Sequence, residues 1–285
     1  MPALLELTKP RITQLVVLTA AAGFYAGSPA GGRIDLWLFL HAMIGTALVA
    51  AGTNALNQLR ERDVDARMQR TQRRPLPSGR LTPRAAAWFA ATISIAGIVY
   101  LGLAVNALTA TLAAGTLASY VFLYTPLKRR TSLNTLVGAV PGALPIVGGW
   151  TAAGGGLDVA AAAFFWILFL WQLPHFLALA WIYREDYARG GLAMLSVEDP
   201  SGRRTSWMAL LYALALVPVS LVPTLVGVTG TLYFFGALAL GAAYVTAGAG
   251  MIVAMTARRA WWVFFVSIVY LPALLILVVL DKVAA

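Results

Sequence analysis

The chain has 285 residues, of which 60% are hydrophobic and only 11% are charged, and its mean hydropathy is +0.78. These values exclude an ordinary soluble globular protein and indicate a protein whose solvent is largely lipid. Cysteine is absent, which excludes disulfides, thiolate nucleophiles and thiolate-held metals.

Apolar runs long enough to cross a bilayer follow one another along most of the chain. About 20 apolar residues span the hydrocarbon core as a helix. The sequence therefore predicts an all-α polytopic membrane protein, with nine transmembrane helices around a central cavity and residues 1–285 in a single domain. The first run is too long for a cleavable signal peptide and is interpreted as a true span. The predicted spans are residues 12–29, 36–56, 85–105, 107–125, 133–153, 160–182, 206–227, 231–255 and 261–280.

The basic residues are distributed unevenly between the two sides of this arrangement. One side holds only Arg33 and Lys282, so the other side holds the remaining 19 of the 21 Lys and Arg residues. Loops rich in Lys and Arg stay in the cytoplasm, so we expect a cytoplasmic amino terminus and an external carboxyl terminus. The net charge of +10 is then mostly a signal of topology. It favours anionic lipids and anionic substrates as partners, whereas nucleic acid is not expected, because no basic module stands outside the membrane.

A charged segment, "NQLRERDVDARMQRTQRRPLPSG", follows the second predicted span. Asn57, Glu61 and Asp65 are four residues apart, so they line one face if the span continues as a helix. Asp63 falls on roughly the opposite side. Oxygen donors near the membrane boundary suit Mg²⁺, which binds one or two carboxylates and completes its coordination shell with water and phosphate oxygens. The alternative is a solvated basic loop whose acids balance its arginines, and the spacing alone leaves both interpretations open.

Basic side chains near these acids are suited to binding the same anion. Guanidinium groups bind phosphate with paired hydrogen bonds, so Arg70 and Arg74 are candidate diphosphate ligands. Lys128 and Arg129, in the inside loop "YTPLKRRTSLN", are candidates too, although basic residues of short inside loops also serve as topology anchors. Asn134, at the inner end of the fifth span, is either a polar contact of the ligand or a helix cap.

A second acidic segment, "WQLPHFLALAWIYREDYARGGLAML", ends the sixth predicted span. His175, Ile182 and Asp186 are seven and four residues apart, so we expect them to share a helix face. The glycine pair at residues 190–191 is expected to end that helix. Two groups of oxygen donors on one membrane face, each surrounded by arginines, predict a two-sided site for a diphosphate with Mg²⁺ between them.

The pattern "N-x-x-x-E-x-x-x-D" followed by "MxRTxxRPLPSG" resembles the first signature of the intramembrane UbiA-type prenyltransferase superfamily. Within that superfamily it is most similar to the protohaem IX farnesyltransferase (haem O synthase) branch. The segments "YTPLKRRTSLNTLVGAVPGALPIVGGW" and "REDYARGGLAMLSV" are similar to that branch as well. The resemblance covers roughly residues 8–280.

Departures from other members of the superfamily favour haem as the acceptor. Gln58, Glu61 and His175 stand where relatives that act on quinone precursors usually carry aspartate. One departure is from the haem branch itself, because Ile146 stands where a second proline is expected after Pro145. This exchange alters the expected kink of the fifth span but removes no chemical group.

The resemblance implies a Mg²⁺-dependent transfer of a farnesyl group from farnesyl diphosphate to the 2-vinyl group of haem B, which gives haem O at the cytoplasmic face. It places the protein in a bacterial-type cytoplasmic membrane, or the inner mitochondrial membrane of a eukaryote, and implies a haem A synthase or terminal oxidase assembly as further partners. The expected catalytic and metal-binding residues are Asn57, Glu61, Asp65 and Asp186. The expected substrate-binding residues are Arg70, Arg74, Lys128, Arg129, Asn134, His175 and Trp171.

Histidines and tryptophans need separate interpretation. His175 is expected either to face the haem or to pack between helices through a hydrogen bond. Trp171, one turn earlier, is expected either to stack on the porphyrin or to pack. His41 lies near the outer end of the second span and is interpreted as an interfacial histidine.

Two rival functions remain open at this stage. The first keeps the fold and changes the acceptor to a quinone or another lipid-pathway molecule. The second is a transporter or assembly scaffold for a tetrapyrrole or lipid. Charges at one membrane face and uncharged stretches such as residues 85–125 disfavour the transporter.

Overall fold

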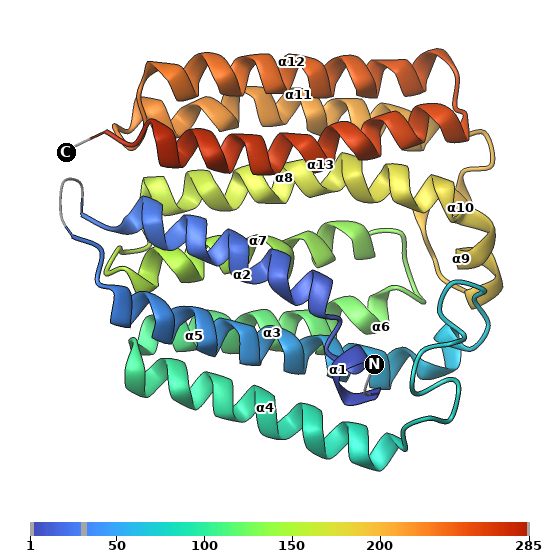
Figure 1. Cartoon of the computed structure of the whole chain (residues 1–285). Helices are drawn as coiled ribbons and strands as arrows, with labels where there is room; N and C mark the ends of the chain where they lie inside the picture. The colour runs from blue at the N-terminus through green and yellow to red at the C-terminus, as the bar shows by residue number, and fades with distance from the viewer. Residues whose placement is uncertain (1–2, 30–32, 284–285) are drawn as a thin grey trace.

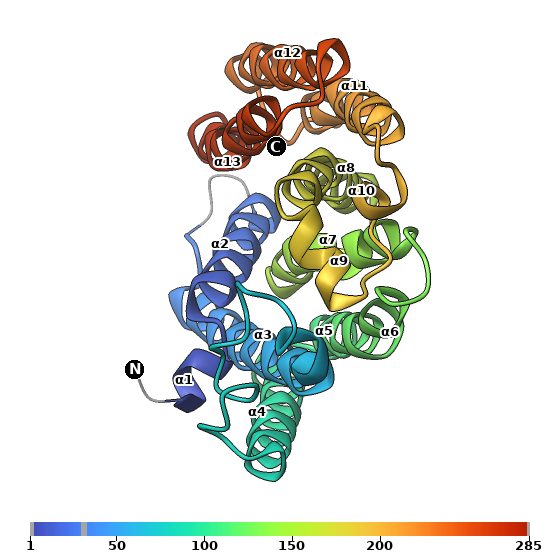
Figure 2. The same ribbon diagram turned by 90° about the vertical axis from the view of Figure 1, so that its right-hand side faces the viewer.

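Long helices make up nearly all of the chain in a computed structural model, which describes residues 3–29 and 33–283. They run side by side as a bundle (Figure 1), and Figure 2 shows the bundle from its end. The elements are α1 (Ala3–Leu7), α2 (Pro10–Gly27), α3 (Leu36–Asp65), α4 (Pro83–Ala104), α5 (Ala107–Ala118), the π-helix η1 (Ser119–Tyr124), α6 (Thr125–Leu127), α7 (Asn134–Ala152), α8 (Val159–Ile182), α9 (Arg184–Gly190), α10 (Leu195–Glu198), α11 (Arg203–Leu225), α12 (Thr231–Val253) and α13 (Ala257–Leu280).

Eight helical stretches in the described part of the chain are long and apolar enough to cross a membrane. They are α3, α4, the continuous stretch Ala107–Leu127, α7, α8, α11, α12 and α13. This confirms the predicted all-α polytopic membrane protein. The remaining predicted span corresponds to α2, an 18-residue helix that is not among the eight but packs between α3 and α7. Nine spans and a cytoplasmic amino terminus therefore stay predictions.

Polar caps begin several of these apolar helices. Each cap side chain accepts a hydrogen bond from the backbone N–H three residues later, which satisfies a donor that the first helical turn leaves free. Asn106 does this for α5 and so confirms the predicted break before that helix. The caps are Asp35 for α3, Thr82 for α4, Asn106 for α5, Asp158 for α8 and Thr256 for α13.

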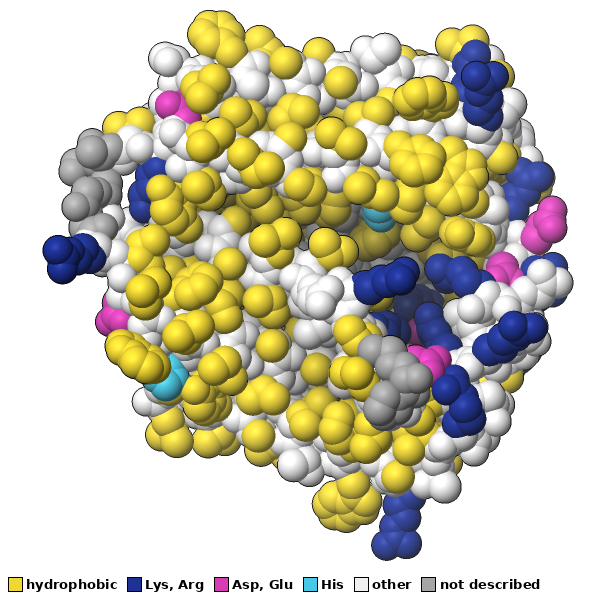
Figure 3. Space-filling model, in the orientation of Figure 1, with side chains coloured by type: hydrophobic (Ala, Val, Ile, Leu, Met, Phe, Trp, Pro, Cys, Tyr) yellow, Lys and Arg dark blue, Asp and Glu magenta, His cyan; other side chains and the backbone are white. Residues whose placement is uncertain are grey.

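The polar connections gather at one end of the bundle. The loop after α3, the loop between α6 and α7, and the segment that carries α9 and α10 all lie at the right-hand end of Figure 1. In Figure 3, Lys and Arg side chains surround a hollow toward that end, with acidic side chains beside them, while most of the face is hydrophobic. The fold thus brings the two acidic segments to the same end.

The carboxyl-terminal halves of α2 and α7 cross closely. A side chain on Gly23 would place its Cβ 2.0 Å from the Ile146 carbonyl oxygen, and one on Gly149 would lie 1.9 Å from the Ala20 carbonyl oxygen. Ile146, where a proline was expected, is fully buried beside this crossing. Only glycine allows the two backbones to approach this closely.

We expect Gly149→Ala to destabilise the protein by about 1–3 kcal/mol, because its methyl group meets backbone atoms that cannot rotate away. The neighbouring Gly148 faces open space, with no atom within 4 Å of an added Cβ. Gly148→Ala is therefore the control, and its better helix propensity predicts an unchanged or slightly higher melting temperature. Thermal unfolding in detergent measures both, and equal melting temperatures would contradict the proposed contact.

Candidate active site

The first acidic group lies on one face at the end of α3. The helix continues to Asp65, nine residues past the predicted span, so Asn57, Glu61 and Asp65 point to the same side, as the spacing predicted. All three side chains are buried, and Asn57 and Asp65 are each only 1% exposed. Asp63 points away, with 68% of its side chain exposed. The group therefore faces the interior of the bundle and is not a solvated loop.

Each of these side chains meets a cation from another segment of the chain. Burying a carboxylate is unfavourable unless an opposite charge or hydrogen bonds compensate it. The cations come from the α1–α2 junction, from the loop after α6 and from the loop after α3. The contacts are Lys9 Nζ to Asn57 Oδ1 at 2.8 Å, Lys128 Nζ to Glu61 Oε1 at 2.8 Å, and Arg74 Nη1 to Asp65 Oδ1 and Oδ2 at 2.8 and 2.7 Å.

Lys9 is a member of this group that the sequence analysis missed. It was counted only as a basic residue of an inside loop, yet its ammonium group donates to Asn57. Burial, followed by the nearby Arg74 cation, lowers the pKa of Lys9 to about 7. Its backbone has φ 49° and ψ 66°, a left-handed conformation that is uncommon for a residue other than glycine and that turns the chain into α2 before Pro10. The sequence signal for this role was the pair Lys9-Pro10, which stands at the expected membrane boundary.

The π-helix η1 adds aromatic groups to the same region. The ammonium group of Lys128 lies 4.4 Å from the ring centre of Tyr124. The Asn57 amide donates to Thr125 Oγ1 at 3.2 Å, and this hydroxyl donates to the Tyr120 carbonyl oxygen at 2.8 Å. Although burial opposes it, the Glu61 carboxylate raises the pKa of Lys128 well above its usual value. Wide helical turns of this kind are frequent at functional sites, and composition alone did not reveal this one.

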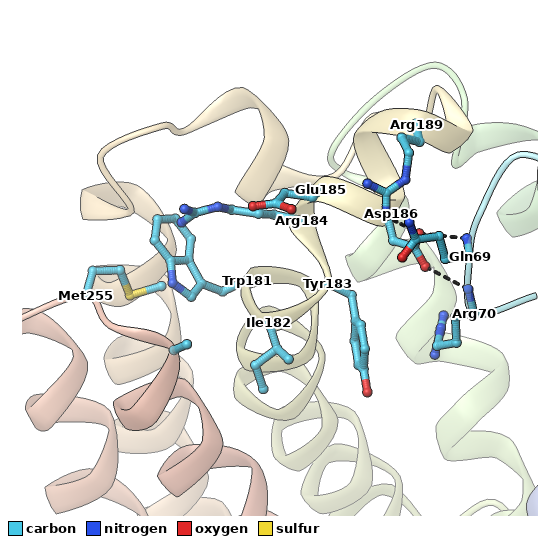
Figure 4. Close-up of a pocket in the computed structure, with 11 residues that line it drawn as sticks. Gln69, Arg70, Trp181, Ile182, Tyr183, Arg184, Glu185, Asp186, Arg189 and Met255 are labelled. Atoms are coloured by element: carbon cyan, nitrogen blue, oxygen red, sulfur yellow. Dashed lines mark hydrogen bonds and ion pairs between the residues drawn. The ribbon is translucent and has the colours of Figure 1, made fainter.

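Asp186, the acid of the second segment, contacts the loop that follows the first. Its Oδ1 accepts from the Gln69 backbone N–H at 2.9 Å and from Arg189 Nη2 at 2.7 Å, while its Oδ2 accepts from the Arg70 backbone N–H at 3.2 Å (Figure 4). Burial alone would raise the pKa of Asp186, but these hydrogen bonds hold it below its usual value. Asp186 therefore binds the loop after α3, and a metal site shared with Asn57, Glu61 and Asp65 stays a prediction.

The prediction that His175, Ile182 and Asp186 share one helix face is wrong. α8 ends at Ile182, and Tyr183 has φ −106° and ψ 23°, outside the helical region. Asp186 belongs to the separate helix α9, which ends at Gly190 and is followed by Gly191 in a left-handed conformation, as expected for the glycine pair. The break lets Asp186 turn toward the loop after α3.

A cavity of about 590 Å³ lies beside Asp186 (Figure 4). Arg70 is exposed and lines it, and its guanidinium carbon lies 4.8 Å from the ring centre of Tyr183 and 5.8 Å from that of Tyr187. Arg70, from the loop after α3, thus packs against the second acidic segment. The lining residues are Gln69, Arg70, Trp181, Ile182, Tyr183, Arg184, Glu185, Asp186, Arg189, Met255 and Ala257.

Two predicted substrate ligands lie outside this group of paired charges. Arg129 is exposed and forms no ion pair with the described residues. Asn134 is fully buried at the start of α7, where its amide nitrogen donates to the carbonyl oxygens of Thr131 at 2.6 Å and Ala193 at 2.7 Å. It joins two loops beneath the site. Direct substrate contacts of both residues stay predictions.

His175 lies on α8 in an aromatic sandwich. Its ring stacks on Phe264 at 4.8 Å and on Trp171 at 5.5 Å between centroids. Its Nδ1 lies 2.7 Å from Ser267 Oγ, and that hydroxyl donates its own hydrogen to the Phe264 carbonyl oxygen. Nδ1 therefore carries the hydrogen, and the lone pair is on Nε2. Trp171 donates from Nε1 to the Ser267 carbonyl oxygen at 2.8 Å, so it packs against α13. His41 hydrogen-bonds Tyr100 at 2.6 Å.

The donor atoms fit a hard, oxygen-binding cation. Within residues 3–29 and 33–283, no group of three or more His, Cys, Asp or Glu side chains is arranged to hold a metal alone. Mg²⁺ does not need such a group, because it binds through one or two carboxylates together with phosphate oxygens and water. The amide of Asn57 and the carboxylates of Glu61 and Asp65 supply oxygen donors on one face. They suit Mg²⁺ better than a metal that prefers nitrogen or sulfur.

The chain is similar to known proteins over nearly its whole length. The family model described as UbiA prenyltransferase matches residues 16–278. The chain is 50% identical to a protoheme IX farnesyltransferase of Solibacter usitatus, over 98% of both chains, and 46% identical to one of Salinibacter ruber, over 97% of both.

Solved structures share the fold at low sequence identity. The chain matches the structure of a digeranylgeranylglyceryl phosphate synthase with a TM-score of 0.82 at 18% identity, covering 98% of this chain and 96% of that one. It matches a UbiA homolog from Archaeoglobus fulgidus bound to DMAPP and Mg²⁺ with a TM-score of 0.69 at 16% identity, covering 96% of this chain and 98% of that one.

We expect Asp186→Ala to expose the loop after α3, because the variant removes the acceptor for the backbone N–H groups of Gln69 and Arg70. Limited trypsin digestion should cleave this arginine-rich loop about tenfold faster than in the parent protein, since hydrogen bonds to a charged group contribute about 1.5–3 kcal/mol. The control is Glu185→Ala, an exposed neighbour without an ion pair among the described residues. Equal cleavage of both variants would show that Asp186 does not hold the loop.

Proposed function

Because the chain belongs to the UbiA prenyltransferase family, we propose that it transfers the farnesyl group of farnesyl diphosphate to the 2-vinyl group of haem B in a Mg²⁺-dependent reaction. Relatives named protoheme IX farnesyltransferase support the choice of substrates. The observation that carries the proposal is the buried group of paired charges at the end of α3, which lies at one end of an apolar bundle.

The basic groups of these pairs are proposed to bind the diphosphate. Arg74 and Lys128 contact the acids and Lys9 contacts the Asn57 amide, so each can turn from its oxygen partner to a phosphate oxygen without leaving the site. Arg70 lines the cavity beside Asp186 and adds a further cation. Asn57, Glu61, Asp65 and Asp186 would hold Mg²⁺, which supplies stabilisation of the negative charge on the departing diphosphate.

The chemistry requires no nucleophile from the protein. The bond between C1 of the farnesyl group and the diphosphate oxygen breaks, and its electron pair leaves with the diphosphate. The π-electrons of the haem vinyl group then form the new carbon–carbon bond to C1. Water adds to the remaining cation and loses a proton, which gives the hydroxyethylfarnesyl side chain of haem O. The basic groups act by stabilising the leaving group in a preorganised site.

His175 is proposed to face the haem. Its Nδ1–H is fixed by Ser267, and its Nε2 has no hydrogen-bond partner in the described part of the chain, so the lone pair of Nε2 is available to the haem iron. The rings of Trp171 and Phe264 hold the imidazole in one orientation. The bacterial relatives support a cytoplasmic membrane as the location.

We expect the purified protein to convert haem B, farnesyl diphosphate and Mg²⁺ into farnesylated haem, detected by mass spectrometry, and to lose this activity when the metal is chelated. Asp65→Asn keeps the shape of the side chain but removes the charge that pairs with Arg74, and should lower kcat by about a hundredfold or more. Asp63→Asn, on the exposed side of α3, is the matched control and should keep its activity. Prenylation of a phenolic acid but not of haem would assign the acceptor to the quinone branch, and no turnover at all would favour a carrier.

We expect His175→Phe to weaken haem binding without affecting farnesyl diphosphate. The KM for haem should rise about tenfold or more, the shift of the haem Soret band on binding should disappear, and the KM for farnesyl diphosphate should stay unchanged. The control is His41→Phe, because His41 hydrogen-bonds Tyr100 at the other end of the bundle. This variant should behave as the parent protein. An unchanged Soret shift in His175→Phe would limit His175 to a packing role.

A further inference from the structure

A second cavity, of about 610 Å³, lies between α7, α8 and α11. Its floor is formed by buried Leu173 and Leu177 of α8, and its rim carries Leu133 and Trp207, which are 60% and 47% exposed. It is therefore a groove that opens on the outside of the bundle. The lining residues are Ser132, Leu133, Thr135, Leu136, Leu173, Leu177, Leu195, Arg203, Arg204, Trp207, Met208 and Tyr212.

This groove is separate from the candidate active site. Leu173 and Leu177 lie two residues to either side of His175, about 200° around the helix axis, so they face away from it. His175 itself contacts Ser267 and Phe264 of α13. The lining contains no carboxylate, so the groove offers no ligand for a metal and is not a second metal–diphosphate site.

Arg203 and Arg204 supply the charge at the rim. Both are exposed at the start of α11, and neither forms an ion pair with the described residues. The nearby Asp199 forms no ion pair with them, and its oxygens accept from Ser201 Oγ, the Thr205 backbone N–H and Thr205 Oγ1 at 2.9–3.0 Å. Two guanidinium groups beside an apolar groove fit an anion that carries a hydrocarbon chain.

We propose that this groove binds an anionic phospholipid, with an acyl chain along Leu136, Leu173 and Leu177 and the phosphate on Arg203 and Arg204. Basic pockets at the ends of membrane helices bind acidic headgroups, and aromatic side chains such as Trp207 are enriched at the same depth. A soluble anion would make no contact with the apolar wall, and a neutral lipid would offer no net negative charge to the two arginines.

The bound lipid contacts the segment that carries Asp186. Leu195, one of the lining residues, is the first residue of α10, which packs on α8, α9 and α11. The lipid thus fills a space between the bundle and the second acidic segment. The lipid is expected to stabilise that segment. The reaction at the active site does not depend on the lipid.

Native mass spectrometry of the full chain in detergent tests this proposal. The protein is incubated with equal amounts of phosphatidylglycerol and phosphatidylcholine that have identical acyl chains. We expect the protein to retain one molecule of phosphatidylglycerol in preference to phosphatidylcholine. The double variant Arg203→Gln/Arg204→Gln should reduce this retention about tenfold or more. Arg84→Gln/Arg258→Gln removes the same charge from two exposed arginines outside the groove and should retain the lipid.

Two further measurements keep the test decisive. Met208→Trp narrows the groove without changing its charge and should weaken retention of both lipids. Farnesyl transfer in detergent alone should be equal for the parent protein and Arg203→Gln/Arg204→Gln, so a failure of the proposed catalytic function is distinguished from a failure of lipid binding. Equal retention of the two lipids, retention unaffected by Arg203→Gln/Arg204→Gln, or displacement of phosphatidylglycerol by inorganic phosphate would overturn the proposal.

Discussion

The structure depends on the compensation of charges buried at the end of α3. Glu61 and Asp65 are buried in a mainly apolar bundle, and each is stable there because a cation pairs with it, Lys128 with Glu61 and Arg74 with Asp65. Lys9 completes the set through Asn57. The need to pair the buried groups of α3 therefore holds the α1–α2 junction, the loop after α3 and the loop after α6 at one point of the bundle. The candidate site is where these pairs form, and we propose that the same cations bind the diphosphate.

Periodicity predicted the parts of this site that lie on one helix. The four-residue spacing of Asn57, Glu61 and Asp65 was sufficient because the residues after the span favour helix, so α3 simply continues. Contacts between segments were not predictable in this way. The bond from Lys9 to Asn57 joins residues 48 positions apart, and nothing local announces it. The end of α8 at Ile182 was also missed, because Tyr183 is neither glycine nor proline and the sequence contains no local signal for a break before the glycine pair.

Hydrogen bonding inside the apolar half of the bundle follows one rule. A polar group surrounded by hydrocarbon must find a partner on a neighbouring helix, so each such group also orients its neighbour. Ser267 illustrates this, because it accepts from His175 and Trp171 with two different oxygens and so fixes α8 against α13. Tyr244 donates to the Trp171 carbonyl oxygen and adds α12 to the same contact. The orientation of His175 is therefore set by three helices, which explains how an imidazole can present a single nitrogen.

The bonds between Asp186 and the backbone of Gln69 and Arg70 have a thermodynamic consequence. If Asp186 binds Mg²⁺ as proposed, its two oxygens cannot hold the loop and the metal ion with full strength at once, and the loop then competes with the ligand. The apparent affinity for a metal–diphosphate complex is then the intrinsic affinity reduced by the free energy needed to release residues 69–70. Ligand binding and loop release become one equilibrium, and a sequence change in the loop can alter substrate affinity without touching the substrate.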